Sequence, residues 1–223
     1  MACALTPEPV PPTGRFVVLE GIDGCGKSTQ LQALAAWLPQ SGLLPPGAEL
    51  VITREPGGTP LGQSLRELLL HPPAQAAPHP SAELLLYAAD RAQHVEQLIR
   101  PALLAGHWVL SDRFSGSTAA YQGYGRGLPL ELIEQLEQIA TAGLVPDLTL
   151  WLELPLAVSQ QRRAGRNGAV PADRIEAAGE AFLRRVHQGF ATLAAQRGWQ
   201  AIAADQEQEA VQAACRQALS VLR

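Results

Sequence analysis

The amino-acid sequence predicts an α/β protein in which a five-stranded parallel sheet carries helices on both faces. Short segments that are almost continuously apolar recur along the chain, and stretches with helical periodicity separate them. Strands that are apolar on both sides are typical of a parallel sheet covered on both faces. The 223 residues are also enough to bury the core of one such domain.

Five apolar segments are expected to be strands, and in each the side chains are mostly apolar or β-branched. Polar residues stand at or just after the ends of several of them, where ligands of parallel sheets bind. The expected strands are Phe16–Glu20, Leu50–Glu55, Trp108–Asp112, Leu148–Glu153 and, with a weaker pattern, Trp199–Ala204.

Helical periodicity is clearest in Gln30–Leu38, where Leu31, Leu34 and Leu38 recur on one face. Such a stripe is expected to pack on the sheet. Longer helical patterns are found at Ser81–Leu104, Leu130–Ala142, Ala178–Arg197 and Glu207–Leu222.

The chain is expected to form a single domain over residues 15–223, preceded by a flexible, proline-rich extension over residues 1–14. Two internal segments are expected to be irregular: His71–Pro80 because of its prolines, and Ala164–Ala172 because of its glycines and other small residues. No internal repeat or interdomain linker is recognisable.

Composition excludes several classes of protein. The net charge of −4 disfavours binding to a nucleic-acid polymer, which usually requires a basic excess. Cys3, Cys25 and Cys215 are few and widely spaced, which favours a reducing compartment such as the cytoplasm and gives no metal-binding pattern. No apolar run reaches the length of a membrane span, and the N-terminus lacks the pattern of a secretory signal.

One motif indicates nucleotide binding. The segment from Gly21 to Ser28 fits G-x-x-x-x-G-K-[ST] and lies between an expected strand and an expected helix, as a phosphate-binding P-loop requires. Its glycines allow backbone N–H groups to face phosphate oxygens, while Lys27 adds positive charge and the Ser28 hydroxyl is a ligand for Mg²⁺. The P-loop NTPase fold is therefore expected, with ATP contacted by Gly21, Ile22, Asp23, Gly24, Cys25, Gly26, Lys27, Ser28 and Thr29. No N-K-x-D motif of a GTPase is present, and motor or transporter ATPases are usually much longer.

Four further motifs narrow the reaction. These are T-R-E-P-G-G-T at Thr53–Thr59, S-D-R-F at Ser111–Phe114, Y-A-A-D-R at Tyr87–Arg91 and D-R-I-E at Asp173–Glu176. Together with the P-loop they resemble bacterial thymidylate kinase, over most of the chain from about Arg15 to about Arg197. The resemblance implies transfer of the ATP γ-phosphoryl group to dTMP, which gives dTDP and ADP in dTTP biosynthesis, and it also implies a homodimer.

The resemblance implies roles for residues on the acceptor side. Asp23 is assigned to the 3′-hydroxyl of dTMP, Arg54 and Arg113 to its phosphate, Tyr87 to stacking on the thymine ring and Arg91 to a base carbonyl. In similar enzymes the stretch after Asp112 surrounds the base and sugar, which assigns Ser117, Thr118, Tyr121 and Gln122 to dTMP, with Tyr121 as a flat wall that excludes a 2′-hydroxyl.

The same resemblance implies the catalytic groups. Asp112 is expected to help hold hydrated Mg²⁺ and to orient the attacking phosphate, together with Lys27 and Arg113. Relatives carry a catalytic arginine either in the P-loop or in a mobile lid. Gly24 occupies the P-loop position here, so arginines of the lid, about residues 163–175, are expected, with Arg166 as the first choice and Arg162 as the second.

Two alternatives remain open on sequence alone. One is a kinase that acts on another nucleoside monophosphate or on a deoxynucleoside. The other is a nucleotide-controlled binding switch without acceptor chemistry, which the paired arginines on the acceptor side disfavour.

Overall fold

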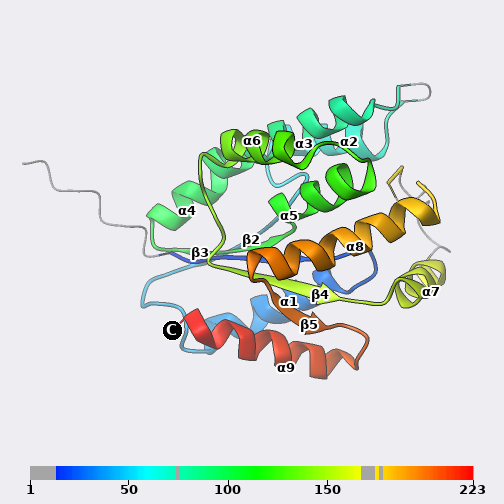
Figure 1. The fold of residues 1–223 in the computed structure, drawn as a ribbon. Coiled ribbons are helices and arrows are strands. Elements are labelled where there is room, and N and C mark those ends of the chain that lie inside the picture. The colour runs from blue at the N-terminus through cyan, green and yellow to red at the C-terminus, as the bar shows by residue number, and fades with distance from the viewer. Residues whose placement is uncertain (1–13, 74–75, 167–173, 176–177, 223) are drawn as a thin grey trace, which may run out of the picture.

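The computed structural model describes residues 14–73, 76–166, 174–175 and 178–222, without the side chain of Arg166. Its single sheet has the order β2-β3-β1-β4-β5, and every strand pair is parallel. The predicted five-stranded parallel sheet is therefore confirmed (Figure 1). The strands are β1 (Phe16–Glu20), β2 (Leu50–Arg54), β3 (Trp108–Asp112), β4 (Leu148–Glu153) and β5 (Gln200–Ala203).

The central strand β1 shows why the sheet is covered on both sides. Successive side chains of a strand point to opposite faces. Phe16 and Val18 pack in a cluster with Ile99 of the helical layer on one side. Val17 and Leu19 pack in the larger cluster. All five residues of β1 are buried, and the first four, Phe16 to Leu19, are apolar, as expected of a strand covered on both faces.

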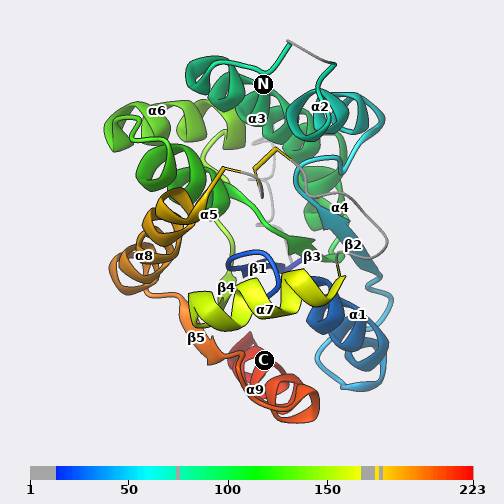
Figure 2. The same ribbon diagram turned by 90° about the vertical axis from the view of Figure 1, so that its right-hand side faces the viewer.

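Helices form a layer on each face of the sheet. Figures 1 and 2 show α1 (Lys27–Trp37) and α9 (Gln208–Leu219) together on one face, with the remaining large helices on the other. That second layer contains α2 (Pro60–Leu70), α3 (Pro80–His94), α4 (Arg100–Leu104), α5 (Ser115–Thr118), α6 (Leu130–Thr141) and α8 (Glu180–Arg197). No helix among the described residues is long and apolar enough to cross a membrane.

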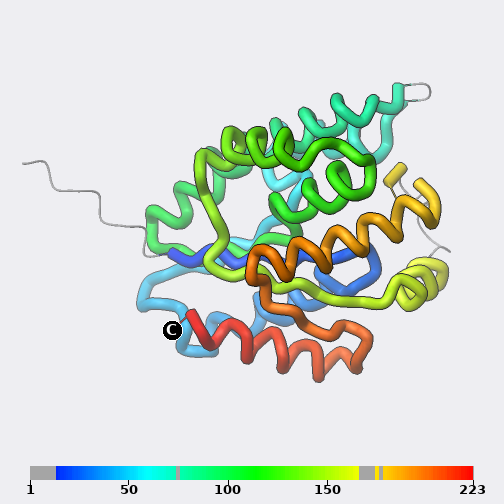
Figure 3. Tube along the Cα trace, viewed as in Figure 1, coloured from blue at the N-terminus to red at the C-terminus, as the bar shows by residue number. Residues whose placement is uncertain are grey.

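The loops that carry chemistry gather at one edge. The trace in Figure 3 shows the loop after β1 and the helix α7 (Leu156–Arg166) at the same end of the molecule, beyond the carboxyl ends of the strands. Figure 2 looks onto this edge, with α7 passing in front of the loop. This is where a parallel sheet binds its ligands.

Some elements differ from the sequence-based expectation. The expected helix over Ser81–Leu104 contains a π-helical turn, η2 (Val95–Ile99), between α3 and α4, and a second π-helical segment, η3 (Ala119–Gly125), follows α5. Two short 3₁₀ segments, η1 (Leu38–Gln40) and η4 (Ser220–Leu222), extend α1 and α9.

Besides the short α5, two longer helices lie outside the predicted helical segments. Helix α2 begins at Pro60, and the Thr59 side chain caps it by accepting a 3.0 Å hydrogen bond from the Gly62 amide. Helix α7 continues to Arg166, so the expectation that irregular structure begins at Ala164 was wrong. The rest of that expected segment, residues 167–172, lies outside the described residues. Residues 1–13 of the expected extension also lie outside them.

Candidate active site

The loop between β1 and α1 has the geometry of an anion site. Gly21 has φ of 143°, and a Cβ there would lie 2.8 Å from both Cys25 Sγ and the Leu152 carbonyl oxygen, so only glycine fits. Gly26 precedes α1 with φ of 96° and brings no side-chain acceptor to its first turn. The first N–H groups of α1 are thus left for an anion, which the helix dipole also favours.

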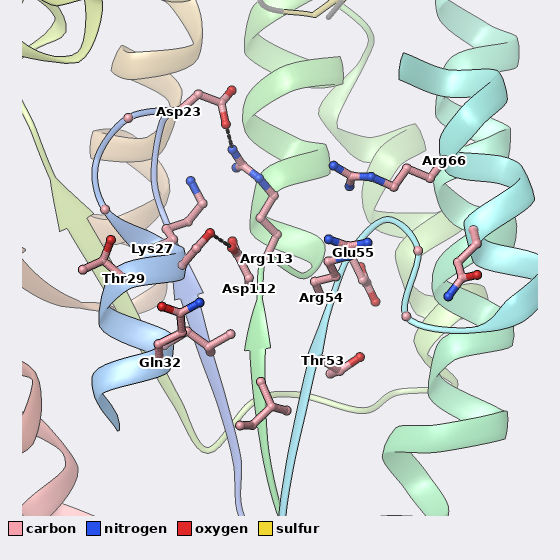
Figure 4. A pocket seen from close by; sticks show the side chains of 18 of the residues that line it. Asp23, Lys27, Thr29, Gln32, Thr53, Arg54, Glu55, Arg66, Asp112 and Arg113 are labelled. Carbon is pink, nitrogen blue, oxygen red and sulfur yellow. Dashed lines mark hydrogen bonds and ion pairs between the residues drawn. The ribbon is translucent and has the colours of Figure 1, made fainter. Parts of the chain in front are cut away.

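Lys27 and Ser28 stand at the start of α1. The Lys27 ammonium is 7% exposed and donates to the carbonyl oxygens of Gly21, at 3.0 Å, and Ile22, at 3.1 Å. Ser28 Oγ donates to Asp112 Oδ2 at 3.0 Å (Figure 4). The other carboxylate oxygen, Asp112 Oδ1, is buried without a hydrogen-bond partner among the described residues. An oxygen ligand beside a hydroxyl at a phosphate loop is the donor set that Mg²⁺ uses when phosphates and waters complete its shell.

Two cavities open at this edge of the sheet. The larger, about 970 Å³, is lined by the loop after β1, the first turns of α1, the end of β2 and α2. The smaller, about 100 Å³, lies between α3 and the segment after β3. Both cavities are lined by Asp23, Glu55, Arg66 and Arg113, so they join at these four residues.

Arg113 links the two cavities. Its side chain donates to Asp23 Oδ1 at 2.5 Å, to the Gly21 carbonyl oxygen at 3.0 Å and to Ser117 Oγ at 2.9 Å. Tyr121 also donates to Asp23, from its hydroxyl at 2.9 Å, and the Arg113 guanidinium lies over its ring. Burial opposes ionisation of Asp23, but Arg113 and Lys27 outweigh it and hold the pKa of Asp23 well below its ordinary value.

Arg91 lies on the wall of the smaller cavity and is 2% exposed. Its Nε donates to Glu55 Oε2 and its NH2 to Thr118 Oγ1, both at 2.9 Å, whereas NH1 is buried without a hydrogen-bond partner among the described residues. Glu55 is also hydrogen-bonded to His94 Nδ1, at 2.8 Å. Arg91 is therefore held in place by Glu55 and Thr118, and the two N–H donors of its NH1 have no partner among the described residues.

Most predicted acceptor residues come together around the smaller cavity. Its lining includes Asp23, Tyr87, Arg91, Arg113, Ser117, Thr118, Tyr121 and Gln122. Arg54 differs: it ends β2 beside Asp112 and lines only the larger cavity among these two.

Predicted donor residues divide in a similar way. Asp23, Gly24, Gly26, Lys27, Ser28 and Thr29 line the larger cavity, as does Arg162 of α7. Ile22 and Cys25 have buried side chains beneath the loop, and burial raises the pKa of the Cys25 thiol. Arg166 ends α7, and its side chain is outside the described structure.

Sequence reasoning missed Arg66. This arginine of α2 lines both cavities, and Figure 4 shows its side chain extending toward Arg113. Its NH1 donates to the Pro56 carbonyl oxygen at 3.0 Å. No motif marks this residue; the available signal was an arginine in the first helix after a glycine-rich strand end.

Comparisons of the sequence with a family model and with known proteins identify the same family. The family model described as thymidylate kinase matches residues 19–215. A thymidylate kinase of Synechococcus sp. (strain CC9605) is 69% identical over 202 residues, which cover 91% of this chain and 95% of the relative. Thymidylate kinases of Parasynechococcus marenigrum (strain WH8102) and Prochlorococcus marinus (strain MIT 9313) are also 69% identical, over 89% and 91% of this chain and 93% and 92% of the relatives.

Proposed function

The chain belongs to the thymidylate kinase family, and we propose that its two joined cavities hold ATP and dTMP end to end. The enzyme is a phosphotransferase that converts ATP and dTMP to ADP and dTDP, the diphosphate required for dTTP. The observation that carries the arrangement is Arg113, which lines both cavities and contacts the phosphate loop at the Gly21 carbonyl oxygen.

On the donor side, the triphosphate lies along the loop from Gly21 to Thr29. The amides at the start of α1 bind phosphate oxygens, and Lys27 neutralises the β- and γ-phosphates. The hydrogen bonds from Lys27 to the loop carbonyls support this role, because they hold the ammonium within the curve of the loop.

On the acceptor side, the thymidine monophosphate lies in the smaller cavity. Arg113 and Arg54 bind its phosphate, Tyr87 stacks on the base, and Arg91 donates from its NH1 to a base carbonyl. Asp23 accepts a hydrogen bond from the sugar 3′-hydroxyl. Ser117, Thr118, Tyr121 and Gln122 enclose the sugar and base.

Mg²⁺ fits the polar atoms beside the phosphate loop. Ser28 Oγ and the unpartnered Asp112 Oδ1 would hold it, largely through water. The ion would supply positive charge that offsets the negative charge of the phosphates.

Positioning supplies most of the catalysis in this proposal. The acceptor phosphate already carries a nucleophilic oxygen, so the protein needs no strong base. Asp112 and Arg113 orient that oxygen toward the γ-phosphorus, and Arg162 and Arg166 of α7 stabilise the charge of the transferring group.

Acceptor screening tests the assignment. Purified protein with ATP and Mg²⁺ is assayed for ADP release with dTMP, dUMP, CMP, AMP or thymidine, and the product is identified by chromatography. We expect rapid formation of dTDP from dTMP. We expect dUMP to be either inert or a weaker substrate. Equal turnover of CMP, AMP or thymidine would support the broader kinase alternative, and slow hydrolysis that dTMP does not stimulate would support a nucleotide-controlled switch.

We also propose a homodimer formed through the outer surface of α2, α3 and α6. These three helices lie in one layer (Figure 1). Large apolar side chains on them are exposed. The exposed residues are Leu61, Leu68, Leu85, Leu130, Leu132 and Ile139. Light scattering is expected to give twice the 23.7 kDa chain mass, and Leu85→Arg is expected to shift it to the monomer.

A cytoplasmic location completes the proposal. The two cysteines that the structure describes, Cys25 and Cys215, are buried free thiols, as a reducing compartment favours. Cell fractionation with an antibody against the chain tests this, and recovery from a secreted or membrane fraction would contradict it.

A further inference from the structure

Glu83 is a buried carboxylate that the proposed reaction does not yet use. It lies in the first turn of α3 and is completely buried. It is not among the lining residues of either substrate cavity. A buried carboxylate is costly unless it has a set of hydrogen-bond donors, so its partners indicate what it does.

Three side chains donate to Glu83, two from η3 and its C-terminal end and one from a distant segment. Gln122 Nε2 donates to Oε1 at 2.7 Å, and Arg126 donates to both carboxylate oxygens at 3.2 Å. Arg174, from the D-R-I-E motif at the end of the expected lid, donates to Oε2. Arg174 also donates from its Nε to the Leu69 carbonyl oxygen, at 3.2 Å. Both guanidinium groups are therefore directed at one carboxylate.

These partners keep Glu83 ionised. Burial opposes ionisation, but hydrogen bonds from Arg126, Gln122 and Arg174 outweigh it and hold the pKa of Glu83 below its ordinary value. An ionised carboxylate only accepts hydrogen bonds. The NH₂ group of the Gln122 amide must then face Glu83, and its Oε1 must point the other way.

The orientation of this amide matters because Gln122 lines the smaller cavity. The Gln122 amide oxygen is then left as an acceptor there, and Arg91, which lines the same cavity, has a guanidinium nitrogen, NH1, without a hydrogen-bond partner among the described residues. Thymine and uracil offer the complementary edge, with N3–H as donor and O4 as acceptor. Cytosine offers the opposite pattern, with N3 as acceptor and an amino group as donor.

We propose that Glu83 is a positioning residue that sets the base specificity of the acceptor site, by holding the Gln122 amide with its oxygen toward the pyrimidine. The inference rests on the proposed function, since it takes the smaller cavity as the base site. The Gln122 amide held in this orientation selects bases with an N3–H group and rejects cytosine, although Glu83 itself does not line the cavity.

Replacing the carboxylate separates this role from simple packing. In Glu83→Gln the new amide both donates and accepts, so the Gln122 amide is free to turn and present N–H to N3 of cytosine. In Glu83→Asp the group still only accepts, so the orientation is retained with a shorter reach. Arg126→Gln removes one partner of Glu83 but leaves the contact to Gln122 intact, and it is the matched control.

The experiment measures kcat/KM for dTMP and for dCMP in the full-length enzyme, together with dissociation constants for both by calorimetry. Thermal unfolding of each variant checks its fold. We expect Glu83→Gln to lower the ratio of dTMP to dCMP by about tenfold, because Arg91 still opposes the cytosine amino group. Glu83→Asp and Arg126→Gln should keep the ratio within about twofold, even where KM for dTMP rises.

Each outcome decides the inference. An unchanged ratio in folded Glu83→Gln overturns it, and so does an equal fall of the ratio in Glu83→Gln and Glu83→Asp. If Glu83→Gln does not fold, the binding ratio in Glu83→Asp decides: retention supports the inference, and a fall of more than about fivefold overturns it. Failure of the proposed function is distinguishable, because the unmodified protein would then not phosphorylate dTMP.

Discussion

Arg113 donates a hydrogen bond to Asp23 and thereby connects the end of β3 to the phosphate loop after β1. Strands β1 and β3 are neighbours in the sheet, so their carboxyl ends bring these residues together although they are far apart in sequence. Arg113 has φ of 72°, a left-handed conformation that side chains rarely adopt. An arginine in an unfavourable backbone conformation on the wall of both cavities indicates that the contacts of its side chain are what the position requires.

Replacing Arg113 should separate activity from stability. Arg113→Ala and Arg113→Gly both remove the guanidinium, so each is expected to lower kcat/KM for dTMP by about 10²-fold or more. Glycine tolerates the left-handed backbone, so Arg113→Gly should be more stable than Arg113→Ala by about 1 kcal/mol. Steady-state kinetics and urea unfolding check both parts. Equal stability of the two variants would argue against strain at this position.

Asp112 is expected to act in catalysis rather than in folding. Its Oδ1 has no partner among the described residues and its Oδ2 accepts from Ser28, so Asp112→Asn should retain the fold. We expect kcat to fall by about 10²- to 10³-fold, with a higher Mg²⁺ concentration for half-maximal rate. Kinetics over a Mg²⁺ titration, with circular dichroism as the folding control, provide the measurement. A variant with normal kcat would remove Asp112 from the mechanism.

Arg91 is predicted to serve both binding and stability. Arg91→Ala leaves Glu55 buried with His94 as its remaining side-chain ion partner among the described residues, so a loss of about 3 to 5 kcal/mol is expected. Affinity for dTMP should weaken much more than affinity for ATP. Arg184→Ala is the control, because Arg184 forms an exposed ion pair with Glu180, with side chains 73% and 62% exposed. Equal weakening of both nucleotides would place Arg91 outside the base site.

Glu137 of α6 makes stability depend on pH. Burial raises its pKa from 4.5 to about 7, although Arg91 and Arg197 oppose the rise. The folded state thus holds a proton that the unfolded state releases above pH 4.5, so stability from this group is full below pH 4.5 and is lost as pH rises through 7. Glu137→Gln should therefore be more stable than the unmodified protein at pH 8 by about 2 kcal/mol, and the difference should vanish near pH 4.5.

Thermal unfolding of Glu137→Gln and the unmodified protein at several pH values tests the direction of this pH dependence. Glu134→Gln is the matched control, because Glu134 lies on the same helix but is exposed. A stabilising effect of Glu137→Gln that was larger at pH 5 than at pH 8 would contradict the prediction.

The lid arginines are expected to act on kcat. Arg162→Ala and Arg166→Ala should each lower kcat by about 10²-fold with little change in KM, because their contacts form with the transferring group. Arg162 lines the larger cavity, and Arg166 ends the same helix one turn later. Initial rates at saturating ATP and dTMP measure the effect, with Arg184→Ala expected to be inert. Normal kcat in both variants would remove α7 from the reaction.

Much of the fold was predictable because its signals are local. The uninterrupted apolar sequence of β1 and the glycines that follow it define a strand and a phosphate loop without tertiary information. Helix α2 carried a local signal as well, the Thr59–Pro60 start, which was overlooked. The continuation of α7 through Gly165 went unpredicted because glycine disfavours helices in isolation.

The remaining features depend on contacts between distant segments. Arg66 matters because α2 packs beside the joined cavities, and Glu83 because Gln122, Arg126 and Arg174 converge on it. Nothing in the residues next to them in the sequence marks either position. Their positions were therefore accessible only from the arrangement of helices in space.

The carbonyl oxygen of Gly21 accepts from both Lys27 and Arg113, each at 3.0 Å. Two positive side chains repel each other, and this oxygen, with the carboxylate of Asp23, offsets that repulsion as the chain folds. In the proposed complex the two cations are therefore in place before the phosphates bind, and little rearrangement of protein dipoles would be required when charge moves from donor to acceptor.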